Sequence, residues 1–255
     1  MRRAALIAVA AVGVFGLAGA VTWLVAFRDT AEPVTVDEAV TSFRTETEQT
    51  PVASPIPVGV YVYTTRGYEK TDALTGVTHR YPRRSTITVA AADCGVSLTW
   101  RVLQGRSTEW IYCAGPDGWE LRSQDERHTF FGTTERTTYV CEDTPIRPAM
   151  APVGTRWHVS CTTDGAEETG SGAVVARKRW SLRGGPTRTE ELIRKTTRFT
   201  GGIRGVARHD LWFDSKSGVP VRVVMVSRTT NDSTVGDVHY EEDVTLLLTS
   251  LTSKR

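Results

Sequence analysis

From residue 58 to the end of the chain, apolar and polar residues alternate with a period of two. Within residues 96–102, Val96, Leu98, Trp100 and Val102 share one face, and Ser97, Thr99 and Arg101 share the other. This period is typical of a β-strand with one buried face and one solvated face. Twelve such runs, separated by turn-forming residues, extend from residues 58–65 to residues 237–251. The pattern therefore predicts one antiparallel, mainly β domain over residues 58–255.

A continuous apolar segment precedes this domain. Residues 4–27 carry no charged side chain and are longer than the roughly 20 residues that a helix needs to cross a bilayer. Arg2 and Arg3 precede the segment and Arg28 follows it, a bias that keeps the amino terminus in the cytoplasm. We therefore predict a single-pass membrane anchor with a short cytoplasmic tail over residues 1–28, and an extracytoplasmic C-terminal domain.

A cleavable signal peptide is the alternative for the same segment. Ala18-Gly19-Ala20 fits a small-residue cleavage site, and cleavage after Ala20 would release a secreted protein. Strong hydrophobicity continues through Phe27, whereas a signal peptide turns polar near its cleavage site, which favours the uncleaved anchor. Both interpretations place everything after residue 28 outside the cytoplasm.

A polar, proline-containing linker is expected over residues 29–57. Within it, Val36, Ala39, Val40 and Phe43 have helical spacing and predict a short juxtamembrane helix over residues 35–45. Thr35 and Glu38 have the spacing of a capping box at the start of this helix. Residues 46–57 are then expected to form a spacer that lifts the β domain off the membrane.

The four cysteines agree with an oxidising compartment. Cys94, Cys113, Cys141 and Cys161 all follow the apolar segment, and their spacing of about 20 residues fits no compact zinc motif. Three pairings are possible. We favour Cys94–Cys113 and Cys141–Cys161, because each pair brackets two neighbouring strand-like runs; four reduced thiols would instead require a cytosolic protein.

The amino-acid composition bears on the organism that encodes the chain and on the partners that it can bind. The net charge is only +2, so no nucleic-acid partner is expected. Only five of the 31 basic residues are lysine, and Asn231 is the only asparagine. This bias is typical of a GC-rich genome and favours an actinobacterial origin.

No catalytic or metal-binding pattern stands out, so we expect neither an enzyme nor a cofactor. The five histidines are scattered and are expected at the surface or at the edge of the sheet: His79, His128, His158, His209 and His239. There is no nucleophile elbow and no phosphate-binding loop. Adjacent acidic residues are expected on solvated strand faces: Glu167-Glu168, Glu190-Glu191 and Glu241-Glu242-Asp243.

One motif resembles a known family. Residues 210–222 read Asp-Leu-Trp-Phe-Asp-Ser-Lys-Ser-Gly-Val-Pro-Val-Arg, a strand, a turn at Gly218 and a second strand. The pattern W-x-D-x-x-x-G-x-P-x-R resembles a hairpin of LolA-like and LppX-like envelope proteins. That resemblance implies a curved half-barrel with an apolar cavity. Members of the family carry lipids or lipoproteins. The whole layout also resembles uncharacterised single-pass envelope proteins of actinobacteria.

We therefore expect a membrane-anchored, non-enzymatic half-barrel whose concave face binds an apolar or amphiphilic envelope molecule. The residues expected to line that face are Trp100, Trp110, Trp212, Val223 and Met225. The alternative is an interaction or scaffold module with a filled core, whose protein partner the sequence does not identify. A third hypothesis, an envelope hydrolase, requires a histidine, a carboxylate and a hydroxyl to converge in a cleft.

Overall fold

The computed structural model describes residues 31–47, 56–74, 76–115, 118–142, 144–148, 151–182, 185–233 and 236–255. The predicted anchor over residues 1–28, its alternative cleavage site after Ala20 and most of the spacer lie outside these ranges. Within them, no helix has both the length and the apolar character needed to cross a membrane.

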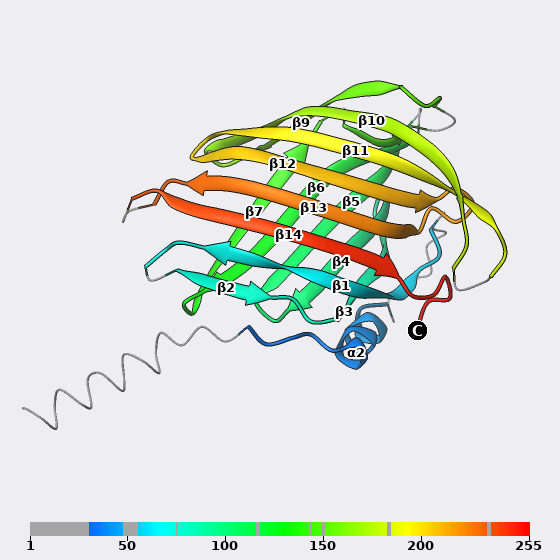
Figure 1. The fold of residues 1–255 in the computed structure, drawn as a ribbon, viewed down its shortest axis with the longest axis horizontal. Coiled ribbons are helices and arrows are strands. Elements are labelled where there is room, and N and C mark those ends of the chain that lie inside the picture. Colours follow the sequence, from blue (N-terminus) through cyan, green and yellow to red (C-terminus); the bar gives the residue numbers. More distant parts are fainter. Residues whose placement is uncertain are drawn as a thin grey trace, which may run out of the picture.

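Antiparallel strands form a closed barrel (Figure 1). Twelve of them follow one another around the ring in this order: β14 (Val238–Leu248), β13 (Pro220–Asn231), β12 (Ile203–Asp214), β11 (Arg188–Gly201), β10 (Ala166–Trp180), β9 (Arg156–Thr163), β7 (Thr133–Cys141), β6 (Gly118–Phe130), β5 (Arg106–Gly115), β4 (Gly95–Leu103), β3 (Arg84–Ala92) and β1 (Gly59–Thr71). The twelve runs predicted from the alternation correspond to these twelve strands. The prediction of an antiparallel, mainly β domain is confirmed.

The barrel is closed, and the prediction of a half-barrel is wrong. β1 pairs with β14 over nine residues, from Tyr63 opposite Leu248 to Thr71 opposite Tyr240. This pairing satisfies the backbone groups of two long strands that would otherwise be exposed sheet edges. Alternation within each strand does not reveal whether the first and last strands meet, so the sequence pattern is the same for open and closed sheets.

Two short strands lie outside the ring and were not predicted. β2 (Val77–Arg80) pairs with β1, and β8 (Pro145–Pro148) pairs with β6. Each spans only four residues, too few to show a period of two. Prolines at both ends of β8 are compatible with its peripheral position, since proline cannot donate to a central ladder.

The predicted short helix is present as α2 (Val36–Thr47). Thr35 and Glu38 form the expected capping box: the Glu38 amide donates to Thr35 Oγ1 at 3.2 Å, and the Thr35 amide donates to Glu38 Oε2 at 2.7 Å. The helix packs its apolar face against the outside of the barrel, where Phe43 and Val40 form a small cluster with Val60.

Both predicted disulfides, Cys94–Cys113 and Cys141–Cys161, are present. The second joins directly opposed residues of β7 and β9. These two strands pair only at Val140–Thr162 and Cys141–Cys161, whereas every other pair of neighbouring ring strands is matched over at least six residues. The disulfide therefore closes the ring at its shortest ladder, which we call the β7–β9 seam.

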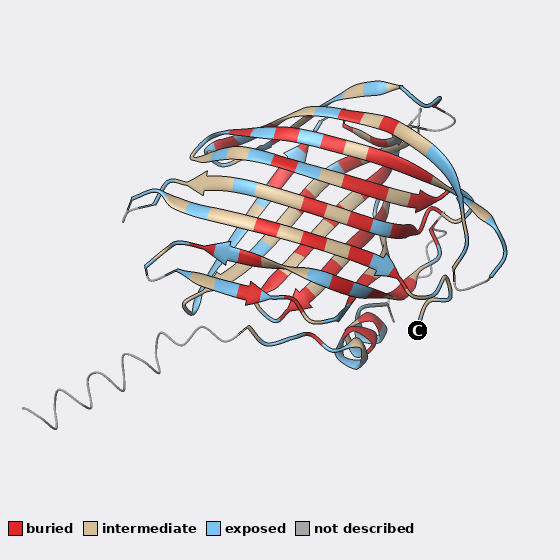
Figure 2. Cartoon of the chain, in the orientation of Figure 1, coloured by how far each residue is buried: buried red, intermediate tan, exposed pale blue. Residues whose placement is uncertain are grey.

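The two ends of the barrel differ. Large apolar side chains fill the end near the β12–β13 turn, drawn at the right in Figure 2, where buried residues gather. Trp100, Ile87 and Leu246 are essentially inaccessible to solvent there. We call this end the packed end. The opposite end, formed by the β6–β7, β9–β10, β11–β12 and β13–β14 turns, encloses a cavity and is called the mouth.

Candidate functional site

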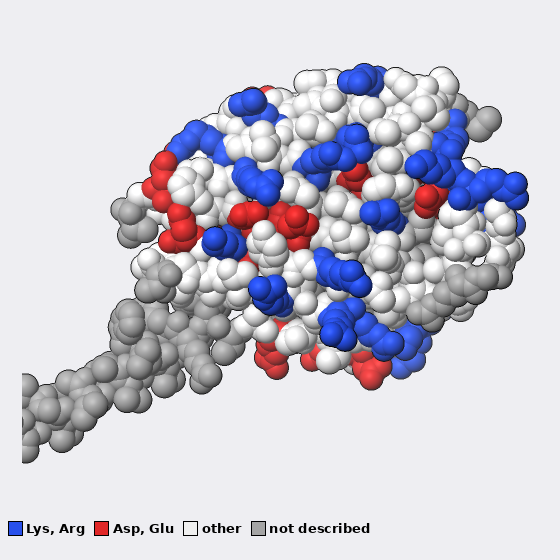
Figure 3. Space-filling model, viewed as in Figure 1, with Lys and Arg blue, Asp and Glu red and all other residues white. Residues whose placement is uncertain are grey.

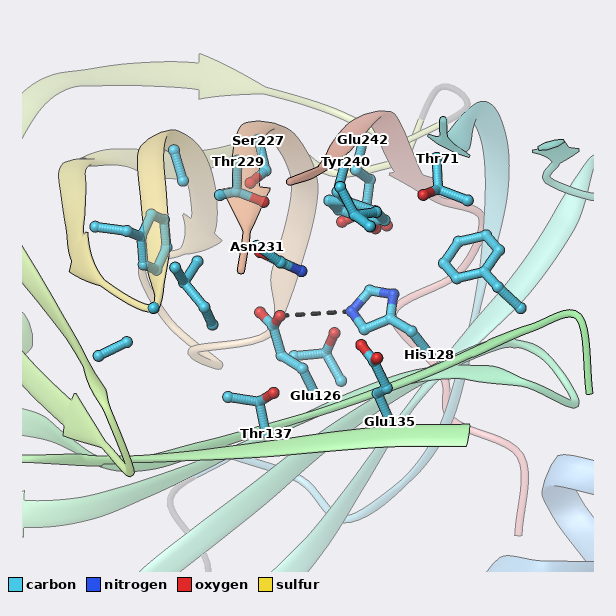
Figure 4. Close-up of a pocket in the computed structure, with 18 of the residues that line it drawn as sticks. Thr71, Glu126, His128, Glu135, Thr137, Ser227, Thr229, Asn231, Tyr240 and Glu242 are labelled. Carbon is cyan, nitrogen blue, oxygen red and sulfur yellow. Dashed lines mark ion pairs between the residues drawn. The ribbon is translucent and has the colours of Figure 1, made fainter. Parts of the chain in front are cut away.

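A cavity of about 650 Å³ occupies the mouth half of the barrel. Its walls are inward-facing residues of β5, β6, β7, β12, β13 and β14, and its rim is formed by the turns between mouth-side strand ends. Figure 4 shows side chains from β6 and β7 on one side of this space and side chains from β13 and β14 on the other.

The cavity exists because inward-facing positions change character halfway along several strands. On β13, inward positions run Val221, Val223 and Met225 toward the packed end, and then Ser227, Thr229 and Asn231 toward the mouth. On β14 they run Leu248, Leu246 and Val244, and then Glu242, Tyr240 and Val238. The inward side chains of β13 become polar toward the mouth and no longer form an apolar core, so the same strands pack tightly at one end and line a cavity at the other.

His128 lies between two carboxylates on the cavity wall. Its Nδ1 is 3.1 Å from Glu69 Oε2, and its Nε2 is 3.6 Å from Glu126 Oε2 (Figure 4). Burial alone would lower the pKa of His128, and so would Arg106, but the two carboxylates outweigh both and raise this pKa above its ordinary value. The imidazole is thereby favoured in its charged form.

The same contacts hold both carboxylates ionised. Burial opposes ionisation of Glu69 and Glu126, but hydrogen bonds from histidine and the charge of Arg106 lower each pKa to about 2. Gln124 Nε2 donates to Glu126 Oε1 at 2.6 Å. Tyr240 Oη donates to Glu69 Oε2 at 3.3 Å, so the anion is held from several strands at once.

A buried ion pair forms the cavity floor. Arg106 Nε and Nη2 donate to the two oxygens of Glu242 at 3.1 and 2.9 Å. Arg106 Nη1 donates to Thr108 Oγ1 at 2.6 Å and to the Ser107 carbonyl at 2.8 Å. Tyr81 donates its hydroxyl to Glu242 as well. The bidentate geometry and the added hydrogen bonds compensate the desolvation of both charges.

A second buried pair lies beside this floor. Lys195 Nζ is 2.8 Å from Glu168 Oε1, which also accepts a hydrogen bond from Thr197 Oγ1 at 2.7 Å. His209 is directly opposite Lys195 on β12 and faces the cavity. Burial, reinforced by the charge of Lys195, lowers the pKa of His209 to about 4, so its imidazole is neutral at pH 7.

Aromatic rings complete the wall. Phe130 stacks on His79 with ring centroids 5.0 Å apart, and His128 meets the ring of Tyr240 edge-on at 5.0 Å. Trp110 lines the cavity and donates its indole N–H to Gln124 Oε1 at 3.1 Å. The cavity thus combines π faces with ionised side chains, a lining suited to a ligand with both apolar and charged parts.

Only two of the five predicted lining residues reach this cavity. Trp110 and Met225 line it, whereas Trp100 and Val223 belong to the packed end. Trp212 alternates with the inward-facing Leu211 and Phe213 and so lies on the outer wall, where the Arg222 guanidinium stacks 4.5 Å from its ring centre. Trp212 is therefore not on the inner face, whereas Trp100 and Val223 are on that face but outside the cavity, because residue type alone does not show where the cavity begins along each strand.

The outer wall around Trp212 carries paired charges. Asp210 accepts hydrogen bonds from Arg194 at 2.6 Å and from Arg208 at 2.6 Å. Figure 3 shows basic side chains spread over this face of the molecule with acidic side chains between them. This mixed, exposed surface is that of a solvated barrel exterior.

Several histidines and glutamates lie in the interior and not at the surface, where the sequence pattern predicted them. His79, His128 and His209 gather inside the barrel, while His158 and His239 are exposed as expected. One glutamate in each adjacent acidic group is buried: Glu168, Glu191 and Glu242. Since neighbouring strand residues point to opposite faces, an acidic pair always places one carboxylate on the inner face of a barrel. This rule, together with the polar inward-facing residues at the mouth end of β13, could have predicted from the sequence that carboxylates lie inside the barrel.

Both ring nitrogens of His128 face carboxylates. Among the described residues, no group of three or more histidine, cysteine or acidic side chains is placed to hold a metal ion.

Comparisons with known proteins add no assignment to this geometry. No family model, no curated protein and no solved structure matches the chain.

Proposed function

We propose that this protein is a non-enzymatic binding protein that holds an amphiphilic small molecule inside its barrel. The observation that carries the proposal is the cavity of about 650 Å³, lined by aromatic rings and by the charged side chains of Glu126 and His128. Its volume lies within the range of about 300–1,000 Å³ that is usual for small-molecule pockets. The mouth supplies a route from solvent that the packed end lacks.

The proposed location is the extracytoplasmic side of the cell membrane. Two disulfides are compatible with an oxidising compartment. The apolar segment over residues 4–27 supplies the proposed single-pass anchor. Such a protein would present its barrel to envelope molecules, as the resemblance to LolA-like and LppX-like carriers suggested.

A scaffold module with a filled core is the competing proposal. A scaffold needs no internal space, whereas the inward polar residues of β13 and β14 leave one at a cost in apolar packing. The cavity therefore favours the binding protein. Two adjacent residues of β12 allow a direct test, because Ala207 faces the cavity and Val206 faces the solvent.

The test is native mass spectrometry of the full chain purified from the envelope of its own host, combined with organic extraction. We expect a stoichiometric extra mass on the unaltered protein and on the control Val206→Phe. The cavity-filling variant Ala207→Phe should lose that mass while remaining folded by circular dichroism. An unliganded mass for all three proteins, or equal ligand retention by Ala207→Phe, would contradict the proposal.

A further inference from the structure

The interior around the cavity carries an excess of negative charge. Five inward-facing carboxylates belong to Glu69, Glu126, Glu135, Glu168 and Glu242, and two permanent cations to Arg106 and Lys195. His209 is neutral at pH 7, as described above. Even if His79 and His128 are both protonated, the described groups amount to five negative charges against four positive ones. Low-dielectric barrel walls focus this field into the cavity.

The cations are not available to an anionic ligand. Arg106 directs its guanidinium N–H groups at Glu242, Thr108 and the Ser107 carbonyl. The Lys195 side chain is only 3% exposed and is paired with Glu168. His128, the remaining cation of the wall, directs its two ring nitrogens at Glu69 and Glu126. A carboxylate or phosphate entering the cavity would therefore lose its hydration and compete with carboxylates that are already in place for each of these three cations.

Two carboxylates face the open space and can take a further partner. Glu126 already accepts a hydrogen bond from Gln124 and contacts His128, but the two oxygens of a carboxylate offer about four acceptor sites. Glu126 on β6 and Glu135 on β7 both point into the cavity in Figure 4. In the β6–β7 register Glu126 is opposite Thr137 and His128 is opposite Glu135, so the two glutamates are diagonal neighbours on one face. Such neighbours are about 7–8 Å apart, a gap that one cationic group can bridge.

The surrounding rings suit the same kind of group. Phe130 and Tyr240 flank His128 and contact each other at 6.3 Å between ring centres. Aromatic faces attract ammonium and guanidinium groups, and the attraction grows when the site is shielded from water. Thr229 and Asn231 on the opposite wall offer hydrogen-bonding oxygens to the same space.

From this geometry we infer that the cavity binds an amphiphile with a cationic head, an ammonium or guanidinium group, held between Glu126 and Glu135 beside the rings of Phe130 and Tyr240. The inference rests on the proposed binding function and specifies the charge of the ligand. It differs from the sequence-based expectation, which left the polar part of the molecule open.

The test compares three eight-carbon ligands by isothermal titration calorimetry: octyltrimethylammonium, octanol and octanoate. The full chain is used in phosphatidylcholine nanodiscs, and the heat measured with empty nanodiscs is subtracted. We expect octyltrimethylammonium to bind about tenfold tighter than octanol, with octanoate weakest, because its positive charge is attracted by the two carboxylates and by the aromatic faces. Quenching of tryptophan emission should follow the same order, since Trp110 lines the cavity.

Matched variants test whether Glu126 and Glu135 supply the negative charge that attracts the ligand. Glu126→Gln and Glu135→Gln should each weaken octyltrimethylammonium binding about tenfold and leave octanol binding unchanged. Glu167→Gln removes the same charge from the exposed outer face of β10 and should change neither. Glu135 is exposed at the mouth, so its variant keeps the test valid if Glu126→Gln fails to fold.

The outcomes separate the inference from the proposed function. Tighter binding of octanoate or octanol than of octyltrimethylammonium would overturn the cationic assignment and leave a binding protein. Equal weakening by Glu167→Gln would also overturn it, because the effect would then be a general surface-charge effect. Binding of none of the three ligands would contradict the proposed function itself.

Discussion

The packed end and the mouth of the barrel are built from the same strands and yet have opposite interiors. On β13 the inward side chains are the apolar Val223 and Met225 and then the polar Ser227 and Thr229, so the change falls between residues 225 and 227. At the packed end, burial of apolar surface holds the strands together. At the mouth, ion pairs and hydrogen bonds take over that role and leave an open cavity. The comparison shows that alternation decides which face of a strand is inside, while the position along the strand decides whether the inside is core or site.

The largest effect is expected from emptying the packed end. Trp100 is fully buried and donates its indole N–H to Ser85 Oγ at 3.0 Å. Trp100→Ala should lower the free energy of unfolding by about 3–5 kcal/mol, because it leaves a large cavity. Urea unfolding followed by circular dichroism measures the loss. Trp212→Ala on the outer wall is the control, with a much smaller loss; equal losses would show that the two tryptophans are not differently placed.

Breaking the charge pair at the cavity floor should have a comparable effect. Arg106→Met leaves Glu242 buried without its partner, which costs about 3–5 kcal/mol when the remaining charge cannot relax. Arg136→Met removes a guanidinium from an ion pair with Asp125 whose arginine is 70% exposed. That control should cost at most about 1 kcal/mol. Similar thermal shifts for both variants would mean that water screens the cavity floor as it screens the surface.

The two disulfides provide the next comparison. Their sequence separations are 19 and 20 residues, so chain entropy alone predicts a similar loss of about 3 kcal/mol for removing either one. Removing Cys141–Cys161 should in addition open the β7–β9 seam, where only two residue pairs join the strands. Hydrogen exchange should then show faster exchange on β7 for Cys141→Ala/Cys161→Ala than for Cys94→Ala/Cys113→Ala. Equal protection of β7 would show that its ladder to β6 is sufficient.

A smaller, graded change in stability is expected when the pH is varied, and it arises from the ionisable side chains at the mouth. The pKa values of Glu69 and Glu126 are about 2 in the folded protein, against an ordinary value of 4.5. The unfolded chain therefore binds more protons between these values, and the free energy of unfolding falls as the pH drops from 4.5 to about 2. His128 acts in the opposite sense: its stabilising contribution is complete below 6.5 and is lost as the pH rises through its raised pKa.

Buried His209, whose pKa is lowered to about 4, adds to the loss in acid, because the unfolded chain binds its proton at a higher pH than the folded protein does. The melting temperature measured from pH 3 to pH 9 should therefore be highest near pH 6.5, the ordinary pKa of histidine, and fall on both sides. The groups facing His128 set this profile: Glu69, Glu126 and Glu135 on the acidic side, and Arg106, His79 and His209 on the basic side. Glu126→Gln should flatten the decline in acid. A profile that this variant leaves unchanged would assign the acid sensitivity to carboxylates elsewhere.

Local features of this protein could be predicted from its sequence, and features that depend on distant pairing could not. The twelve ring strands, the Thr35–Glu38 capping box and both disulfides each depend on residues close together in the chain. Closure depends on β1 meeting β14, and the site depends on Glu69, Arg106 and Glu126 converging from different strands. The periodicity of a strand does not show which inner faces lie opposite one another. The residues predicted to line the cavity therefore include Trp110 and Met225 but none of its charged residues.

The contact between β1 and β14 also sets an order of assembly. Both disulfides join strands that are close in the chain, so each can form while the sheet is still open. The closing ladder joins the first and last strands of the ring, and pairings between such distant segments form slowly. β14 also supplies Tyr240 and Glu242, so Arg106 has no bidentate partner and the cavity has no complete wall until that strand docks. The cavity is thus completed in the last step of folding, and under the proposed function a chain that lacks its last strand has no enclosed site for the ligand.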